Sequence, residues 1–272
     1  MISDGEAAET NPYAAPLTRA SHDEDFGTIE GSFVHTSITA KVGEAFKLFG
    51  GNLGLISMII LTIWLPANLL IYFLESRTFD PESGRSLAGL ANIVEGLFGP
   101  ICVGAVIHLV SQRMAGHRVT YGEAMGVGLR NWTQLFGTRL LTGLFIILGL
   151  IALIVPGIIL ALRFALIDPI VILEGRSGRE AQKRSQNLTT GYKLQIFLGG
   201  ILSVLPIFIV AFLGGMVFAL MPQLQNVITS SILGCALNVL GTILIITGYL
   251  IYRESAGLRS KKKPSPAQFV DI

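Results

Sequence analysis

The chain has 272 residues, of which 51% are hydrophobic and only 14% are charged. Soluble domains carry about 25% charged residues, so this chain has too few polar side chains to coat a soluble globule of its size. The formal net charge of +2 gives no indication of a nucleic-acid partner, and we expect none.

Six stretches of low polarity follow one another along the chain, and each approaches the ~20 residues that cross ~30 Å of hydrocarbon. Three of them lack charged residues, namely residues 53–74, 196–220 and 228–251, and residues 138–155 carry only Arg139, at the edge of the preceding connection. Two more, residues 87–110 and 157–173, carry only Glu95, His108, Arg163 and Asp168. The pattern predicts an all-α, polytopic membrane helical bundle with six spans.

Basic residues are concentrated in alternate connections between these stretches. The segment before the first stretch, residues 111–137, residues 174–195 and the C-terminal tail are rich in Lys and Arg, whereas the other connections hold few or none. The positive-inside rule assigns the basic segments to the cytoplasm. We therefore expect a multi-pass protein of the bacterial cytoplasmic membrane with both termini in the cytoplasm.

The third and fourth spans admit two topologies. Residues 138–173 give two crossings of about 17 residues, or ~26 Å each at helical rise, which is short for a bilayer. Pro156 and Gly157 are expected to supply the break between them. Two full spans and a re-entrant hairpin both agree with the alternation of charge.

Polar tails flank the membrane region. Residues 1–30 are acidic and rich in Ala and Pro, and we interpret them as a disordered cytoplasmic tail. Residues 31–253 are expected to form one six-span membrane domain. Residues 254–272 are interpreted as a basic cytoplasmic tail.

An amphipathic stretch precedes each pair of spans. Apolar residues at helical spacing run from Ile38 to Leu53, from Tyr121 to Phe136 and from Ala181 to Ile196. An acidic–alanine pair accompanies each stretch, namely Glu44-Ala45, Glu123-Ala124 and Glu180-Ala181. We interpret the chain as three copies of an interfacial helix followed by a helical hairpin. The alternative is that any cytoplasmic segment leading into a span tends to be amphipathic.

Ionisable side chains inside a membrane are costly and mark candidate functional sites. Glu95 and Arg163 have similar expected depths, roughly 12 Å and 9 Å from the outer surface at helical rise, so we expect them to pair. Asp168 lies near the midplane before Pro169, which has no N–H and leaves a carbonyl one turn back free. Asp168 is thus expected to be an ion or proton site, to be protonated, or to pair with Arg163. Glu95, Arg163 and Asp168 form the candidate intramembrane polar site.

The sequence contains no pattern typical of a catalytic or metal centre. HExxH, GxSxG, P-loop and CxxC motifs are absent, and the four histidines lack the spacing of metal ligands. We therefore expect no enzymatic activity and no cofactor.

Residues 155–197 carry the following motifs: Pro156-Gly157, Arg163, Pro169, Glu174-Gly175, Ala181, Arg184-Ser185, Leu188-Thr189 and Gly191. In these positions the chain resembles the membrane domain of some bacterial glycerophosphoryl diester phosphodiesterases, a domain that also stands alone in inner-membrane proteins. The resemblance implies a six-span membrane domain. In that family the phosphodiesterase activity belongs to a separate soluble barrel, for which this chain has no room, so the activity does not carry over. Asp168 matches no position of the family pattern.

A basic helix after the Gly175–Gly178 turn is expected at the inner membrane surface. It carries Arg179, Lys183 and Arg184, which are candidate contacts for lipid phosphates. Anchoring by the positive-inside rule is the simpler explanation and needs only their charge. We predict a non-enzymatic, lipid- or envelope-associated membrane module whose partners are membrane lipids, anionic ones included. The alternative is a small permease or ion-coupled transporter that uses the intramembrane charges.

Overall fold

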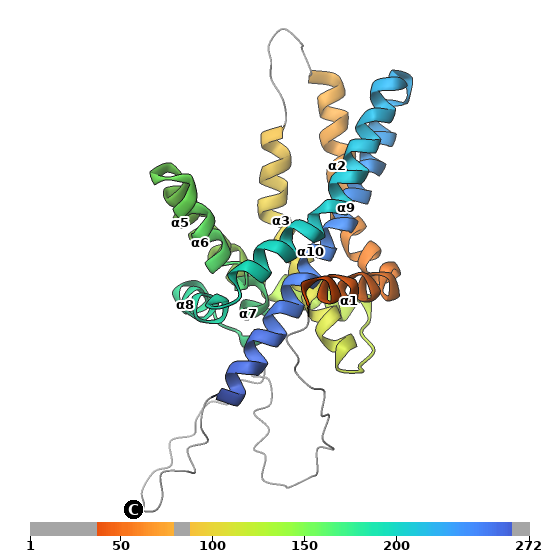
Figure 1. The fold of residues 1–272 in the computed structure, drawn as a ribbon. Coiled ribbons are helices and arrows are strands. Elements are labelled where there is room, and N and C mark those ends of the chain that lie inside the picture. The colour runs from red at the N-terminus through yellow and green to blue at the C-terminus, as the bar shows by residue number, and fades with distance from the viewer. Residues whose placement is uncertain (1–36, 79–87, 263–272) are drawn as a thin grey trace, which may run out of the picture. The chain divides into compact units, whose positions relative to one another are not determined.

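The computed structural model describes residues 37–78 and 88–262, which form helices and no strands within these ranges (Figure 1). The described helices are α1 (Ile38–Gly51), α2 (Leu53–Thr78), α3 (Ala88–Met114), α4 (Tyr121–Arg130), α5 (Trp132–Ala152), α6 (Ile154–Arg163), α7 (Ile167–Glu174), α8 (Gly178–Thr189), α9 (Lys193–Leu220), the 3-10 helix η1 (Pro222–Leu224) and α10 (Val227–Lys262). The all-α fold expected from the sequence is confirmed.

Six segments of the described chain are long and apolar enough to cross a membrane. They are Leu53–Leu74, Asn92–Met114, Trp132–Ala152, Ile154–Glu174, Lys193–Leu220 and Val227–Gly257. These segments correspond to the six predicted spans, so the polytopic bundle is confirmed. The fourth segment is a broken helix, because α6 ends at Arg163 and α7 begins at Ile167. Helix α6 alone is about 15 Å long and needs α7 to complete a crossing.

The turn between α5 and α6 lies at Leu153, which has an extended backbone, and not at Pro156 and Gly157 as predicted. Pro156 fits within the first turn of α6, because the N–H groups of a first turn have no helical acceptor to lose. Gly157 serves helix packing instead, since a Cβ at this position would collide with the side chain of Leu150 on α5.

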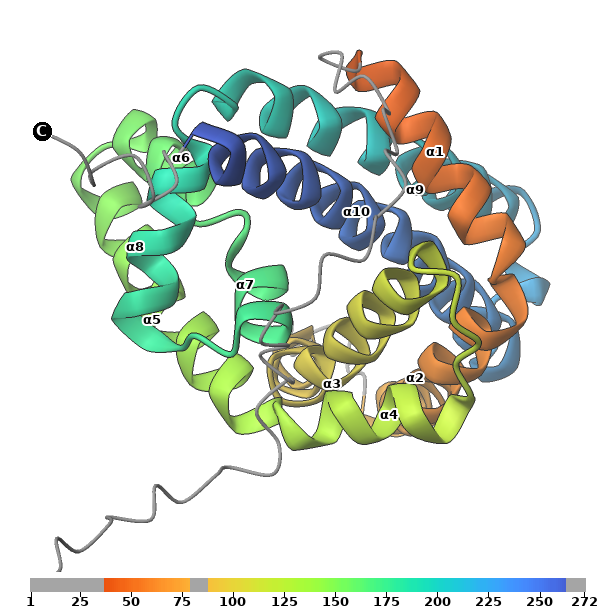
Figure 2. The ribbon, with the colours of Figure 1, turned by 90° about the horizontal axis from the view of Figure 1, so that it is seen from below.

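Helices α1, α4 and α8 correspond to the three predicted amphipathic stretches, and each precedes one helical hairpin. Helix α4 ends at Arg130 and α8 at Thr189, before the predicted ends at Phe136 and Ile196, which belong to the following spans. Seen from below, they surround the ends of α3, α7 and α10 (Figure 2). The alanines of the three acidic–alanine pairs, Ala45, Ala124 and Ala181, are all buried. Each interfacial helix therefore packs on the bundle through the position that the sequence pattern singled out.

The three units, α1–α3, α4–α7 and α8–α10, contact one another in the same way around a ring. The last helix of each unit packs on the interfacial helix of the next, in the pairs α3–α4, α7–α8 and α10–α1. The first span of each unit also contacts the next interfacial helix, in the pairs α2–α4, α5–α8 and α9–α1. This cyclic order supports the interpretation as three structural repeats, with α3, α7 and α10 meeting at the centre.

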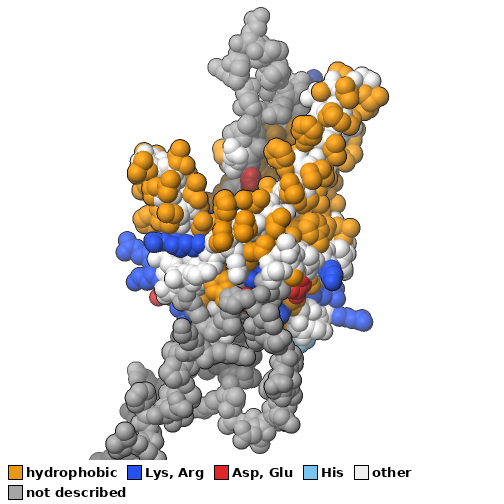
Figure 3. All heavy atoms as spheres, viewed as in Figure 1, with side chains coloured by type: hydrophobic (Ala, Val, Ile, Leu, Met, Phe, Trp, Pro, Cys, Tyr) orange, Lys and Arg blue, Asp and Glu red, His pale blue; other side chains and the backbone are white. Residues whose placement is uncertain are grey.

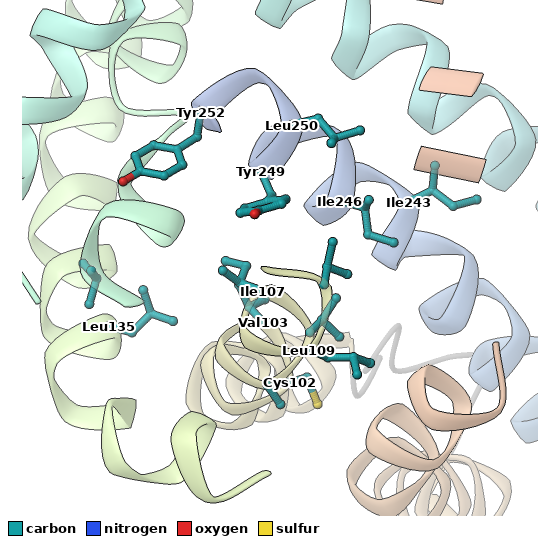
Figure 4. Close-up of a cluster of buried hydrophobic side chains, with 14 of the residues drawn as sticks. Cys102, Val103, Ile107, Leu109, Leu135, Ile243, Ile246, Tyr249, Leu250 and Tyr252 are labelled. Atoms are coloured by element: carbon teal, nitrogen blue, oxygen red, sulfur yellow. The ribbon is translucent and has the colours of Figure 1, made fainter. Parts of the chain in front are cut away.

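The buried core lies where these central helices meet. In Figure 4, Val103 and Ile107 of α3 lie next to Tyr249 and Ile246 of α10. All four side chains are buried, and Leu135 of α5 extends the same hydrophobic cluster. The core thus joins all three units rather than the two helices of any one hairpin.

The face of the molecule in Figure 3 divides into an apolar upper part and a band of charge below it. In Figure 3, hydrophobic side chains cover the hairpins, and Lys and Arg gather beneath them at the level of the interfacial helices. Helix α10 continues to Lys262, across the predicted start of the basic tail. The predicted disordered tail, residues 1–30, lies outside the described residues.

Candidate functional site

A cavity of about 270 Å³ lies inside the bundle, where α3, α5, α7, α9 and α10 come together. Most of its wall is apolar, with Ile107, Ile196 and Ile251 among the lining residues. Two charged side chains also line it, namely Arg139 of α5 and Asp168 of α7. A charged pair in a membrane-embedded cavity is a candidate functional site.

Arg139 and Asp168 form a two-point ion pair. The Nε of Arg139 donates to Oδ1 of Asp168 at 2.9 Å, and Nη2 donates to Oδ2 at 2.6 Å. This side-on arrangement matches the planar guanidinium to the carboxylate and is among the strongest polar contacts that side chains form. It fixes α7 against α5 directly after the break in the fourth span.

The break between α6 and α7 determines where Asp168 lies. Asp168 is about 9 Å along α7 from Glu174, and Arg139 is about 10 Å along α5 from Trp132, at helical rise. Glu174 is bound to Arg184 of the interfacial helix α8, and Trp132 directly follows the interfacial helix α4. The ion pair therefore lies a short distance above the level of the interfacial helices, at similar height on both sides of the cavity.

The expected pair between Glu95 and Arg163 is wrong. Within the described residues neither side chain takes part in an ion pair, and both are exposed. Because α6 ends at Arg163, this residue lies next to α8, where its backbone carbonyl accepts hydrogen bonds from Ser185 and Thr189. Of the three predicted intramembrane residues, only Asp168 lines the cavity, and its partner is not Arg163.

Arg139 is the residue that the sequence reasoning missed. The sequence pattern places Arg139 at the edge of the basic connection at residues 111–137, because the third apolar stretch begins at about residue 138. The structure begins this helix at Trp132, which places Arg139 about two turns inside it. The sequence signal for a longer span is the helical spacing of Trp132 and Phe136, which continues the apolar pattern toward the N-terminus. In the structure the rings of these two residues stack on each other.

The predicted basic face lies on α8, which the structure confirms as a helix from Gly178 to Thr189. Arg179 and Lys183 are exposed, one helical turn apart, and neither forms an ion pair with another described residue. Arg184 differs, because its Nε donates to both carboxylate oxygens of Glu174 at 3.0 Å. The free basic face of α8 therefore consists of Arg179 and Lys183.

Glu174 connects three helices at the lower end of the bundle. Besides Arg184 of α8, it accepts a hydrogen bond from the hydroxyl of Tyr252 on α10 at 3.0 Å. Arg176 also forms an ion pair with it at 3.2 Å. Glu174 thus holds α8 in place, so Arg184 has a structural task whatever else it contacts.

The part of the chain that the structure describes contains no group of three or more His, Cys, Asp or Glu side chains able to hold a metal ion. Glu123 is the titratable group outside the spans whose surroundings act on it most clearly. The backbone N–H and the hydroxyl of Thr120 donate to its carboxylate and lower its pKa. These contacts form a capping box at the start of α4.

Comparison with known proteins gives one informative similarity. No family model matches the chain, and no solved structure matches it. The chain is 29% identical over 187 residues to the UPF0259 membrane protein plu2479 of Photorhabdus laumondii subsp. laumondii, which covers 68% of this chain and 71% of that protein. None of these comparisons points to the membrane domain of glycerophosphoryl diester phosphodiesterases. With the six apolar helices, the similarity supports a multi-pass membrane protein related to an uncharacterised family of bacterial membrane proteins.

Proposed function

We propose that the protein is a non-enzymatic membrane module that binds lipid phosphates through the basic face of α8. In this proposal it resides in the bacterial cytoplasmic membrane with both termini in the cytoplasm, as the alternation of basic segments predicts. The observation that carries the proposal is the pair Arg179 and Lys183, exposed on an interfacial helix and without an ion-pair partner among the described residues.

The surroundings of α8 suit a lipid headgroup. The helix lies beneath the apolar hairpin α5–α6, whose exposed residues include Ile151, Leu153 and Ile154. Arg163, at the end of α6, adds a third exposed cation beside α8. Basic side chains at this level meet the phosphates of anionic lipids, each worth about 1 kcal/mol near the surface.

The resemblance found in the sequence at residues 155–197 points to the same region as the lipid site. Several matching positions have structural tasks around α8: Glu174 binds Arg184, and the hydroxyl of Ser185 donates to the carbonyl of Arg163. Gly175 has a positive φ of 65°, a conformation that glycine adopts at low cost. We infer that the resemblance reflects the seating of an interfacial helix on its hairpin.

Lipid analysis of the purified protein tests this proposal. The variant R179Q/K183Q removes the free basic face, and K47Q/R118Q removes two exposed cations outside α8 as a matched control. We expect wild type and control to co-purify with more anionic lipid than the membrane average, and R179Q/K183Q to lose this enrichment. Equal enrichment in all three proteins would reject α8 as the lipid site.

A small permease is the second candidate, favoured by the charged cavity. The function would then use Asp168 and Arg139 rather than Glu95 and Arg163. It predicts that Asp168→Asn abolishes proton or K⁺ flux into liposomes while the protein stays folded. The lipid module predicts no flux for either the wild type or the variant, so one assay separates the two functions.

A further inference from the structure

We propose that the Arg139–Asp168 cavity and the groove beside it form one binding site for a phospholipid whose headgroup carries both a phosphate and a primary ammonium. The headgroup would lie in the cavity and an acyl chain in the groove. This site is separate from the basic face of α8.

The groove is open and apolar, and it runs between α6 and α9. It has a volume of about 450 Å³ and is lined by residues that include Leu162, Phe197, Val204 and Phe208. Every residue lining it is apolar or glycine. In a bilayer such a surface accommodates hydrocarbon, so an acyl chain is its natural occupant.

The groove and the cavity are adjacent, because Ile196 and Gly200 of α9 line both. A ligand could therefore occupy the two spaces together. The cavity alone, at about 270 Å³, falls just below the ~300 Å³ at which ligand pockets begin. It has room for a headgroup but not for a whole lipid, so the chains must lie outside, along the groove.

The ion pair leaves binding capacity on both partners. The guanidinium of Arg139 has five N–H groups and uses two of them on Asp168, so three have no acceptor among the described residues. Each oxygen of Asp168 accepts one hydrogen bond from Arg139 and retains a second lone pair. Arg139 can thus bind a phosphate while Asp168 binds an ammonium.

Charge complementarity selects the headgroup. A phosphate alone would approach Arg139 but face the carboxylate of Asp168, a like charge that costs binding energy. A headgroup with both a phosphate and an ammonium places an opposite charge against each member of the pair. The depth of the pair, about 10 Å along α5 from the level of the interfacial helices, suits a lipid of the nearer leaflet.

Native mass spectrometry of the delipidated protein tests the site. The probes are phosphatidylethanolamine, phosphatidylglycerol, which lacks the ammonium, and free phosphoethanolamine, which lacks the chains. For the wild type we expect phosphatidylethanolamine to bind about tenfold more tightly than phosphatidylglycerol, the ratio expected for one hydrogen bond to a charged group. Free phosphoethanolamine should not bind at the same concentrations.

Two variants separate the two halves of the site. Asp168→Asn keeps the shape of the side chain and removes its charge, so we expect the preference to reverse toward phosphatidylglycerol. Gly200→Leu places a side chain at the junction of groove and cavity, where an added Cβ meets no atom within 4 Å. This variant should lower the affinity of the protein for both lipids at least about tenfold. Gly215→Leu is the matched control on α9, because its Cβ also meets no atom within 4 Å, and it should change nothing.

Other outcomes would overturn the proposal. Equal affinity for both lipids in wild type and Asp168→Asn would show that the ion pair does not read the headgroup. Tight binding of free phosphoethanolamine would indicate a soluble ligand, as in a permease. If Asp168→Asn does not fold, Gly200→Leu still tests the site, because it leaves the ion pair intact. Unchanged lipid affinity in Gly200→Leu would reject the proposal. In the same assay R179Q/K183Q should bind phosphatidylethanolamine as tightly as the wild type, so the test does not depend on the basic face of α8.

Discussion

Two ion pairs in the lower half of the bundle have the same chemistry but different surroundings. Lys41 of α1 is 3% exposed and binds Glu254 of α10 at 2.6 Å, with Gln195 of α9 accepting a second hydrogen bond at 2.9 Å. The side chains of Arg139 and Asp168 are 36% and 27% exposed, and they line a cavity. The first pair is closed over by protein, whereas the second has open space beside it.

This difference separates a structural contact from a binding site. Lys41 joins the first helix of the ring to the last two, so its pair closes the ring. A buried charge that loses its partner is strongly destabilising, because no solvent replaces the contact. Arg139 and Asp168 face a space that water or a ligand can enter, so each can be compensated when the other is changed.

Lys41→Met should have the largest effect on stability. We expect a loss of about 3–5 kcal/mol in the free energy of unfolding, because the carboxylate of Glu254 loses the buried ammonium. Titration with a denaturing detergent, followed by circular dichroism, measures it. K41M/E254M should recover most of the loss, since an apolar pair needs no partner charge. A stable single variant would show that the pair does not hold the ring closed.

Gly128→Ala should cause the next largest loss in the free energy of unfolding. The added Cβ would collide with the backbone carbonyl oxygen of Ile101, where α4 packs on α3. Overpacking of this kind costs about 1–3 kcal/mol. The control is Gly126→Ala on the same helix, whose Cβ meets no atom within 4 Å and which should stabilise the protein slightly. Equal behaviour of the two variants in the same titration would contradict the close approach of α3 and α4.

Arg139→Gln should lower the free energy of unfolding by less than Lys41→Met does. We expect about 1.5 kcal/mol, near the lower end for a hydrogen bond to a charged group, because the cavity lets water reach Asp168. The same detergent titration compares it directly with Lys41→Met. A loss as large as that of Lys41→Met would mean that the cavity does not relieve the carboxylate.

Thr120→Ala should have the smallest effect, because it removes only the N-cap of α4. The expected cost is about 1 kcal/mol, typical for loss of an N-cap. The lowered pKa of Glu123 adds a pH dependence. Its contribution is present above the ordinary pKa of a carboxyl and is lost as the pH falls through the lowered folded-state pKa. Thermal unfolding at neutral and acidic pH measures this, and Thr120→Ala should reduce the acid-dependent part.

The spans and the interfacial helices could be predicted from the sequence, because both depend on local patterns. Apolar length identified the spans, and helical spacing identified α1, α4 and α8, with Ala45, Ala124 and Ala181 buried as the shared pattern suggested. These features need no knowledge of which helices become neighbours.

The partner of Asp168 could not be predicted, because it depends on where helices break. Counting depths along an unbroken fourth span placed Arg163 inside the membrane beside Glu95. The break at residues 164–166 instead leaves Arg163 next to α8 and turns α7 so that Asp168 meets Arg139. Small errors in a helix boundary thus change which charges meet.

The contact between α1 and α10 has a consequence for how the protein is made. Among the described helices, α1 leaves the ribosome first, whereas α9 and α10, which hold it, leave after the others. Until α9 and α10 are synthesised, Lys41 has neither Glu254 nor Gln195 to bind, and α1 must wait at the membrane surface. A chain that stops short of α10 cannot complete this contact, so the ring distinguishes finished chains from truncated ones.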